Sequence, residues 1–165
     1  MRKALVSTAL LSAVLLIAGG NLAQEDIPEL VPAIEIPAND CTKNTVYVDS
    51  KTGLMWQDEA YTDAEDGAFK NNTVAGKAGS LQHAKNYCNT LYYAGHSDWR
   101  LPTSDELMEL HRKPGQVFTN FRGSDFWTST PAATGKYYVV FTADAYRYER
   151  KVAESNYIRC VRCAK

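Results

Sequence analysis

The chain has 165 residues, of which 45% are hydrophobic and 22% are charged, and its formal net charge is −1. These values fit a single folded domain with short appendages, and they exclude wholesale disorder and a fibrous repeat. A near-neutral net charge also argues against a dedicated nucleic-acid-binding protein, because such proteins are normally strongly basic.

Residues 1–23 have the features of a secretory signal peptide. The basic start Met1-Arg2-Lys3 precedes an apolar run over residues 4–18, and small residues follow up to Ala23. This run of 15 residues is shorter than the ~20 that a membrane-spanning helix needs. We therefore expect cleavage near Gly20 or Ala23, no membrane span after cleavage, and an exported protein in the periplasm or at the cell surface.

Residues 24–40 are predicted to form an acidic linker. This stretch contains three prolines and five acidic residues but no basic residue. Such a composition favours an extended tether over a packed structure. The folded domain is then expected over residues 41–165, and these 125 residues are enough for one hydrophobic core.

The domain is predicted to begin with a β-hairpin. Residues 45–48 and 54–56 are short β-prone runs, and residues 49–53 between them have the composition of a turn. Residues 58–79 are polar and rich in Gly, Asn and Asp, which indicates a long loop.

Two helices are predicted next. The first begins after Ser80, a suitable N-cap, because the apolar residues that follow share one helical face over residues 81–91. The second begins after Thr103, since Thr103 and Glu106 form a capping box and Pro102 stands just ahead of it.

The remainder of the chain is rich in aromatic and β-branched residues and is predicted to form four strands, over residues 126–130, 136–141, 146–152 and 157–161. A hairpin, two helices and then an antiparallel meander predict an α+β fold, in which two helices pack on antiparallel strands.

The four cysteines predict disulfide bonds. An even number of cysteines in an oxidising compartment allows three pairings of Cys41, Cys88, Cys160 and Cys163. The CxxC spacing of the last two also occurs in redox motifs and in half a zinc site, but no second CxxC or histidine pair completes such a site. Strand alternation places Cys160 and Cys163 on opposite faces, so we favour two structural disulfides that do not join them to each other.

Several segments resemble one known family. They are Thr52-Gly-Leu-Met-Trp-Gln57, Asp98-Trp-Arg-Leu-Pro-Thr-Ser-Asp-Glu-Leu107, Phe126-Trp-Thr-Ser-Thr130 and Ile158-Arg-Cys-Val-Arg162. In this order they resemble the DUF1566, or Lcl C-terminal domain, family. The resemblance implies a C-type-lectin-like fold, the disulfides Cys88–Cys160 and Cys41–Cys163, and adhesion through sulfated polysaccharides.

The Trp99-Arg-Leu-Pro-Thr103 segment is interpreted as architectural. We expect Trp56, Trp99 and Trp127 to lie in the core, because tryptophans are highly buried on average. Arg100 is expected to have a local acidic or carbonyl partner.

No metal site or cofactor is expected. The three histidines are scattered, and the sugar-binding motifs of calcium-dependent C-type lectins are absent. Clustered carboxylates in the predicted loop could hold calcium, but they lack the spacing of an EF-hand, so a solvated acidic loop is favoured. These carboxylates are Asp58, Asp63, Glu65 and Asp66.

Charge is divided unevenly along the chain. Residues 21–99 contain five Lys/Arg and twelve Asp/Glu, which gives −7, whereas residues 100–165 contain eleven and seven, which gives +4. Basic and tyrosine side chains alternate along the last two predicted strands, and arginine suits sulfate groups. The candidate polyanion-binding residues are Tyr146, Arg147, Tyr148, Arg150, Lys151, Arg159 and Arg162. A solvated face whose charges pair with the acidic half remains the alternative.

The function favoured by these features is an exported, non-catalytic module that binds an anionic, sulfated glycan or a cell-surface partner. The alternative is a structural or protein-interaction module of the cell envelope, which could form oligomers. An oxidase that uses Cys160 and Cys163 is the least favoured, because the chain shows none of the common catalytic motifs.

Overall fold

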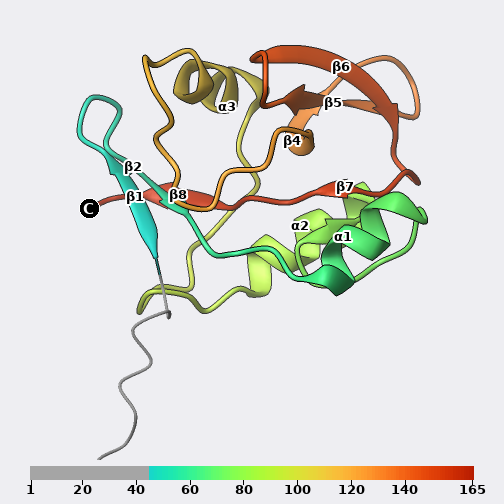
Figure 1. The fold of residues 1–165 in the computed structure, drawn as a ribbon, viewed down its shortest axis with the longest axis horizontal. Helices are drawn as coiled ribbons and strands as arrows, with labels where there is room; N and C mark the ends of the chain where they lie inside the picture. The colour runs from blue at the N-terminus through green and yellow to red at the C-terminus, as the bar shows by residue number, and fades with distance from the viewer. Residues whose placement is uncertain (1–44) are drawn as a thin grey trace, which may run out of the picture. The chain divides into compact units, whose positions relative to one another are not determined.

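The computed structural model describes residues 45–165 (Figure 1). The described residues form two sheets and three helices, and this confirms the α+β class. Their elements are β1 (Val46–Asp49), β2 (Leu54–Gln57), α1 (Asp63–Lys70), β3 (Ala78–Gly79), α2 (Leu81–Thr90), α3 (Ser104–His111), β4 (Asp125–Pro131), β5 (Lys136–Phe141), β6 (Tyr146–Lys151), β7 (Asn156–Tyr157) and β8 (Val161–Cys163).

The smaller sheet contains the predicted hairpin. Its strand order is β1-β2-β8, and both pairs are antiparallel. Gly53 supplies the positive φ of +68° that the hairpin turn needs. The carboxylate of Asp49 accepts hydrogen bonds from the Lys51 amide and the Thr52 hydroxyl, which fixes the turn. The C-terminal strand thus lies beside the hairpin (Figure 1).

The larger sheet has the order β3-β7-β4-β5-β6. Strands β4, β5 and β6 form the predicted meander, but the predicted continuation of that meander over residues 157–161 is wrong. The chain instead returns to the other side of β4 as β7, parallel to it, and then crosses to the smaller sheet as β8. Hydrogen bonds to distant segments fix this crossing. The Ile158 amide donates to the Lys77 carbonyl, and the Ile158 carbonyl accepts from the Tyr61 hydroxyl. The Cys160 carbonyl accepts from the backbone amide of Gln57.

The prediction of a long loop over residues 58–79 is also wrong, because the segment contains α1 and β3. Thr62 and Glu65 form a capping box that starts α1. One side of this mostly polar helix is buried: Ala68 lies in the core, and the Phe69 ring stacks on Tyr157 with centroids 4.6 Å apart. Composition misleads here because two of the acidic residues that make the segment look solvated, Glu65 and Asp66, have cationic partners within the protein.

Both predicted helices are confirmed as α2 and α3, with Ser80 and Thr103 as their N-caps. The three tryptophans lie in the core as predicted, each at most 2% exposed. Trp56 packs in the cluster that contains the buried face of α3, whereas Trp99 and Trp127 pack in the cluster that contains α2.

One predicted disulfide is present. Cys88 of α2 is bonded to Cys160, with their Cα atoms 5.6 Å apart, and both are fully buried. Cys163 is exposed and carries no disulfide within residues 45–165. Its predicted partner Cys41 lies outside the described residues, as do the predicted signal peptide and linker, so these stay predictions. No helix within residues 45–165 is long and apolar enough to cross a membrane.

Candidate functional site

The structure separates the seven predicted polyanion-binding residues into two groups. Five of them lie on β6, which is the end strand of the larger sheet: Tyr146, Arg147, Tyr148, Arg150 and Lys151. Arg159 and Arg162 lie in the segment that crosses between the sheets, and both are buried. The two groups therefore do not form one surface.

Arg159 is an internal crosslink. Its guanidinium donates to the Asp58 carboxylate over 3.2 Å and to the Asn120 carbonyl over 2.6 Å. The same group stands 3.6 Å from the ring centroid of Phe118, at the distance of a cation–π contact. Because it is enclosed on all these sides, Arg159 serves the fold and offers no surface charge to a ligand.

Arg162 of β8 holds the segment that contains Asp98 and Trp99 against this strand. Its guanidinium donates two hydrogen bonds to the Asp98 carboxylate, of 2.7 and 3.1 Å. Hydrogen bonds from Arg162 lower the pKa of Asp98. Arg100 is similarly paired with Glu106 over 2.6 Å, which confirms its predicted acidic partner. The motif around Trp99 is thus architectural.

Side chains alternate across β6, so its five candidate residues point to two faces of the sheet. Tyr146, Tyr148 and Arg150 share one face, and Arg147 and Lys151 share the other. On the second face the strand lies next to α3: Arg147 donates to Asp105 over 3.0 Å and to the Ser104 hydroxyl over 3.2 Å. The Arg147 guanidinium also lies 5.4 Å from the ring centroid of Tyr138 on β5.

A groove of about 370 Å³ lies between α3, β5 and β6. We call it the α3–β6 groove, and it is lined by Met108, Arg112, Tyr138, Tyr146 and Arg147. The guanidinium groups of Arg112 and Arg147, the Tyr138 ring and the Met108 side chain therefore meet at one hollow. Tyr146 borders it, and its ring lies on the other face of β6 beside Tyr148. Among the described residues, no carboxylate forms an ion pair with Arg112.

Sequence reasoning missed Arg112 and Tyr138 in this groove. Arg112 is the C-cap of α3 and stands in a polar segment. Tyr138 lies between Tyr137 and Val139 in β5, where nothing in the sequence distinguishes it from the other strand residues. Neither position carries a local motif. The groove is created by the packing of α3 on β5 and β6, which no short-range pattern predicts.

On its other face, β6 contributes to a second hollow of about 280 Å³ beside α1, lined in part by Phe69, Asp125, Tyr148 and Arg150. The Arg150 guanidinium is paired here with Asp125 over 2.6 Å. Asp125 is buried, so this cation is already neutralised. The α3–β6 groove is therefore the better anion site of the two.

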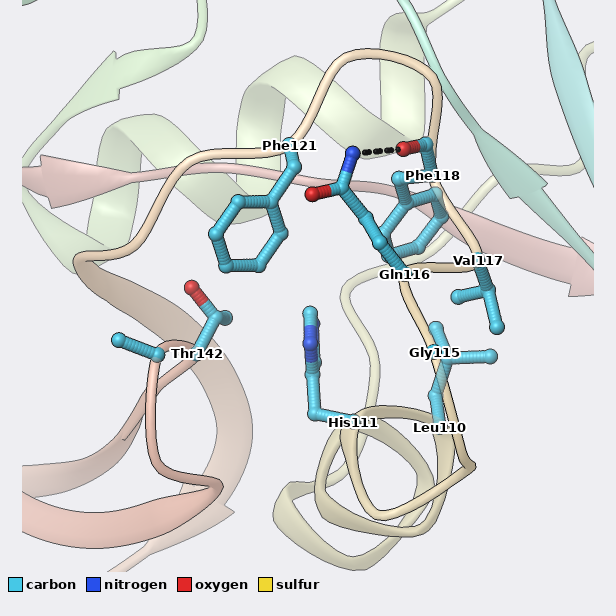
Figure 2. Close-up of a pocket in the computed structure, with 9 residues that line it drawn as sticks. Leu110, His111, Gly115, Gln116, Val117, Phe118, Phe121 and Thr142 are labelled. Atoms are coloured by element: carbon cyan, nitrogen blue, oxygen red, sulfur yellow. Dashed lines mark hydrogen bonds between the residues drawn. The ribbon is translucent and has the colours of Figure 1, made fainter.

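A third hollow, of about 160 Å³, surrounds His111 at the end of α3 (Figure 2). The imidazole points into it between Phe118 and Phe121, with ring centroids 5.7 and 6.0 Å away. Burial, aided by the positive charge of Arg159, lowers the pKa of His111 to about 4. The ring is consequently neutral at neutral pH, and this hollow offers an anion no charge.

The four carboxylates considered as calcium ligands do not converge. Asp58 is paired with Arg159, Glu65 with Lys77 and Asp66 with Arg122, while Asp63 is exposed in the first turn of α1. Within residues 45–165, no group of three or more His, Cys, Asp or Glu side chains is arranged to hold a metal ion. The interpretation of a merely solvated acidic loop is corrected, because three of the four carboxylates have cationic partners within the protein.

The profile of the Lcl C-terminal domain family matches residues 45–162. The chain belongs to the Lcl C-terminal domain family. A search of curated proteins finds no match to the chain. The matched range of this Lcl C-terminal domain includes the larger sheet, the smaller sheet except for Cys163, the Cys88–Cys160 disulfide and every residue that lines the α3–β6 groove.

Proposed function

We propose that this Lcl C-terminal domain is a non-catalytic module of an exported protein and that it binds anionic, sulfated glycans in the α3–β6 groove. The observation that carries the proposal is the meeting of Arg112 and Arg147 with the Tyr138 ring around one hollow. Guanidinium groups bind oxyanions through paired hydrogen bonds, and tyrosine rings pack against the apolar faces of sugar rings.

Arg147 is available to a ligand although it is paired. Its partner Asp105 has a side chain that is 86% exposed, and the Arg147 side chain is 41% exposed. Surface ion pairs of this kind contribute little, because water competes for both groups. A sulfate that binds Arg147 and Arg112 together can therefore replace the contact with Asp105.

Further basic groups extend this face of the sheet away from the groove. Lys151 lies directly opposite Lys136 in the pairing of β5 with β6, and Glu149 neutralises Lys136 in part. Lys151 follows Arg147 by four residues, or about 13 Å along a strand. The face thus offers positive charge over a length that suits a linear polyanion more than a single small anion.

The C-type-lectin-like fold belongs to this proposal. It is supported by the Cys88–Cys160 bond between a helix and the segment before the last strand, and by the last strand lying beside the N-terminal hairpin. An oxidase would need Cys160 and Cys163 as a pair of thiols. Since Cys160 is bonded to Cys88, we propose that the domain has no such activity.

Retention on a heparin column tests the proposal. We expect the protein to bind at low salt, and we expect Arg112→Gln/Arg147→Gln to elute at clearly lower salt. The matched control is Lys70→Gln/Lys165→Gln, which removes the same charge away from α3 and β6, at the last turn of α1 and at the C-terminus (Figure 1). No retention of the wild-type protein, or equal shifts for both double variants, would overturn the proposal.

A further inference from the structure

Strand β6 ends the larger sheet with a regular edge. Its six residues pair with β5 without a bulge, from Lys136 opposite Lys151 to Phe141 opposite Tyr146. Within residues 45–165, no strand covers its other side, and β6 is the outermost strand of its sheet in Figure 1. Unpaired strand edges are templates for a further strand.

The edge also exposes two large aromatic side chains. Tyr146 is 63% exposed and Tyr148 is 40% exposed, and their ring centroids are 5.6 Å apart. Charged residues alternate with them, which is how many proteins repel unwanted strands. The order of these charges decides whether the edge repels a second copy or attracts it.

We propose that two copies of this chain associate by antiparallel pairing of β6 with β6, with the two-fold axis at Tyr148. A two-fold axis perpendicular to a sheet keeps each side chain on its own face, so opposed residues must come from the same face of the strand. This condition puts the axis on a residue of β6. The interior choices are Arg147, Tyr148 and Glu149.

The charges of β6 are self-complementary about Tyr148 only. With the axis there, Arg147 of each copy stands opposite Glu149 of the other, and Tyr146 stands opposite Arg150. With the axis at Arg147, the Arg147 residues of the two copies would lie directly opposite each other. With the axis at Glu149, the two Glu149 residues would lie opposite each other, and Arg147 of each copy would lie opposite Lys151 of the other. Like charges directly opposite each other destabilise a strand pair.

Existing ion pairs extend this complementarity. Within one copy, Lys136 is paired with Glu149 over 3.2 Å and Arg147 with Asp105 over 3.0 Å. Pairing about Tyr148 joins them into a row of alternating sign across the interface, from Lys136 and Glu149 of one copy to Arg147 and Asp105 of the other. On the opposite face, Arg150 already lies 5.6 Å from the Tyr148 ring centroid, and Tyr146 of the second copy adds an aromatic ring beside it.

This inference goes beyond the proposed glycan binding and does not depend on it. Edge pairing uses the backbone of β6, whereas the α3–β6 groove opens on one face of the sheet. A dimer without heparin binding, or a heparin-binding monomer, would separate the two proposals.

Sedimentation of the purified mature protein is the first test, and we expect a species of twice the monomer mass at high concentration. Arg147→Glu sets Glu against Glu149 in both symmetry-related pairs, and Glu149→Arg sets Arg against Arg147. Each variant alone is expected to weaken the dimer at least about tenfold. An equal mixture of the two is expected to recover it, because each copy then meets the opposite charge. A wild-type monomer at all concentrations, or no recovery in the mixture, would overturn the proposal.

Disulfide trapping tests the register, in a background of Cys41→Ser and Cys163→Ser. Two thiols introduced by Tyr148→Cys face each other at the axis and should join into a covalent dimer on mild oxidation. Two thiols introduced by Tyr146→Cys are four residues out of register, or about 13 Å apart along the strands, and should not join. Trapping through Tyr146→Cys but not through Tyr148→Cys would contradict this register.

Discussion

Nη1 of Arg159 lies 3.2 Å from Oδ1 of Asp58, and both side chains are 3% exposed. The pair joins the segment between β7 and β8 to the loop after β2, about a hundred residues earlier in the chain. Asp58 also accepts hydrogen bonds from the backbone amides of Thr119 and Asn120. Three distant segments therefore meet at one buried carboxylate.

Removing the positive charge of this pair should strongly destabilise the domain. We expect Arg159→Met to lower the free energy of unfolding by about 3 kcal/mol or more, because the buried Asp58 side chain would lose its cationic partner. Urea-induced unfolding, followed by tryptophan fluorescence, measures this change.

The control for that experiment is Lys51→Met. Lys51 pairs with Glu109 at the surface, with side chains 74% and 49% exposed, and such pairs contribute at most about 1 kcal/mol. If Arg159→Met cost no more than Lys51→Met, the buried crosslink would be refuted. A loss of heparin binding in Arg159→Met without a loss of stability would instead assign Arg159 to the ligand.

Local chemistry predicted the parts of the fold that are set by short segments. The hairpin turn at Gly53 and the N-caps Ser80 and Thr103 each depend on residues within a few positions, and all three are present. The cap at Thr62 is of the same kind, but the polar composition of residues 58–79 hid it. Prediction failed there because composition was weighed above the Thr62–Glu65 spacing.

Which basic side chains are exposed and which are buried could not be predicted from local sequence. Arg147 and Arg159 both lie close to tyrosines in predicted strands, yet Arg147 is exposed on β6 and Arg159 is buried against Asp58. The difference is that Arg159 has a buried partner, Asp58, about a hundred residues earlier in the chain. Arg112 and Tyr138 enter the groove for the same reason, since only the packing of α3 on the sheet brings them together.

The buried disulfide should be a major source of stability. Cys88 and Cys160 are separated by 72 residues, so their bond restricts the unfolded chain considerably. We expect Cys88→Ala/Cys160→Ala to lower the free energy of unfolding by roughly 2–5 kcal/mol. Thermal unfolding with and without a reductant measures it. Cys163→Ser, at an exposed position, should leave the transition unchanged, and an equal effect of both changes would contradict the assignment.

Stability should decrease on mild acidification because of His111. Its pKa is about 4 in the folded protein, lowered first by burial and then by Arg159, and about 6.5 in the unfolded chain. The unfolded state therefore binds the proton first. The contribution is complete above pH 6.5, decreases as the pH falls, and levels off below about pH 4, with a total of up to roughly 3 kcal/mol.

Urea unfolding at a series of pH values, compared between the wild-type protein and His111→Gln, isolates this effect. The variant should lose most of the pH dependence between 6.5 and 4. Carboxylates contribute at lower pH: although burial alone would raise the pKa of Glu106, hydrogen bonds from Arg100 and Thr103 lower it below its usual value. Identical pH profiles for the two proteins would show that His111 is not held neutral.

The central claim is that the α3–β6 groove binds a sulfated glycan. The most direct measurement is the dissociation constant of a heparin-derived oligosaccharide, determined by calorimetry at two salt concentrations. We expect the wild-type protein to bind more weakly at the higher salt, and Arg112→Gln/Arg147→Gln to bind at least about tenfold more weakly than the wild type. Lys70→Gln/Lys165→Gln should change the constant by less than about twofold. Equal affinity of the groove variant and the wild-type protein would contradict the claim.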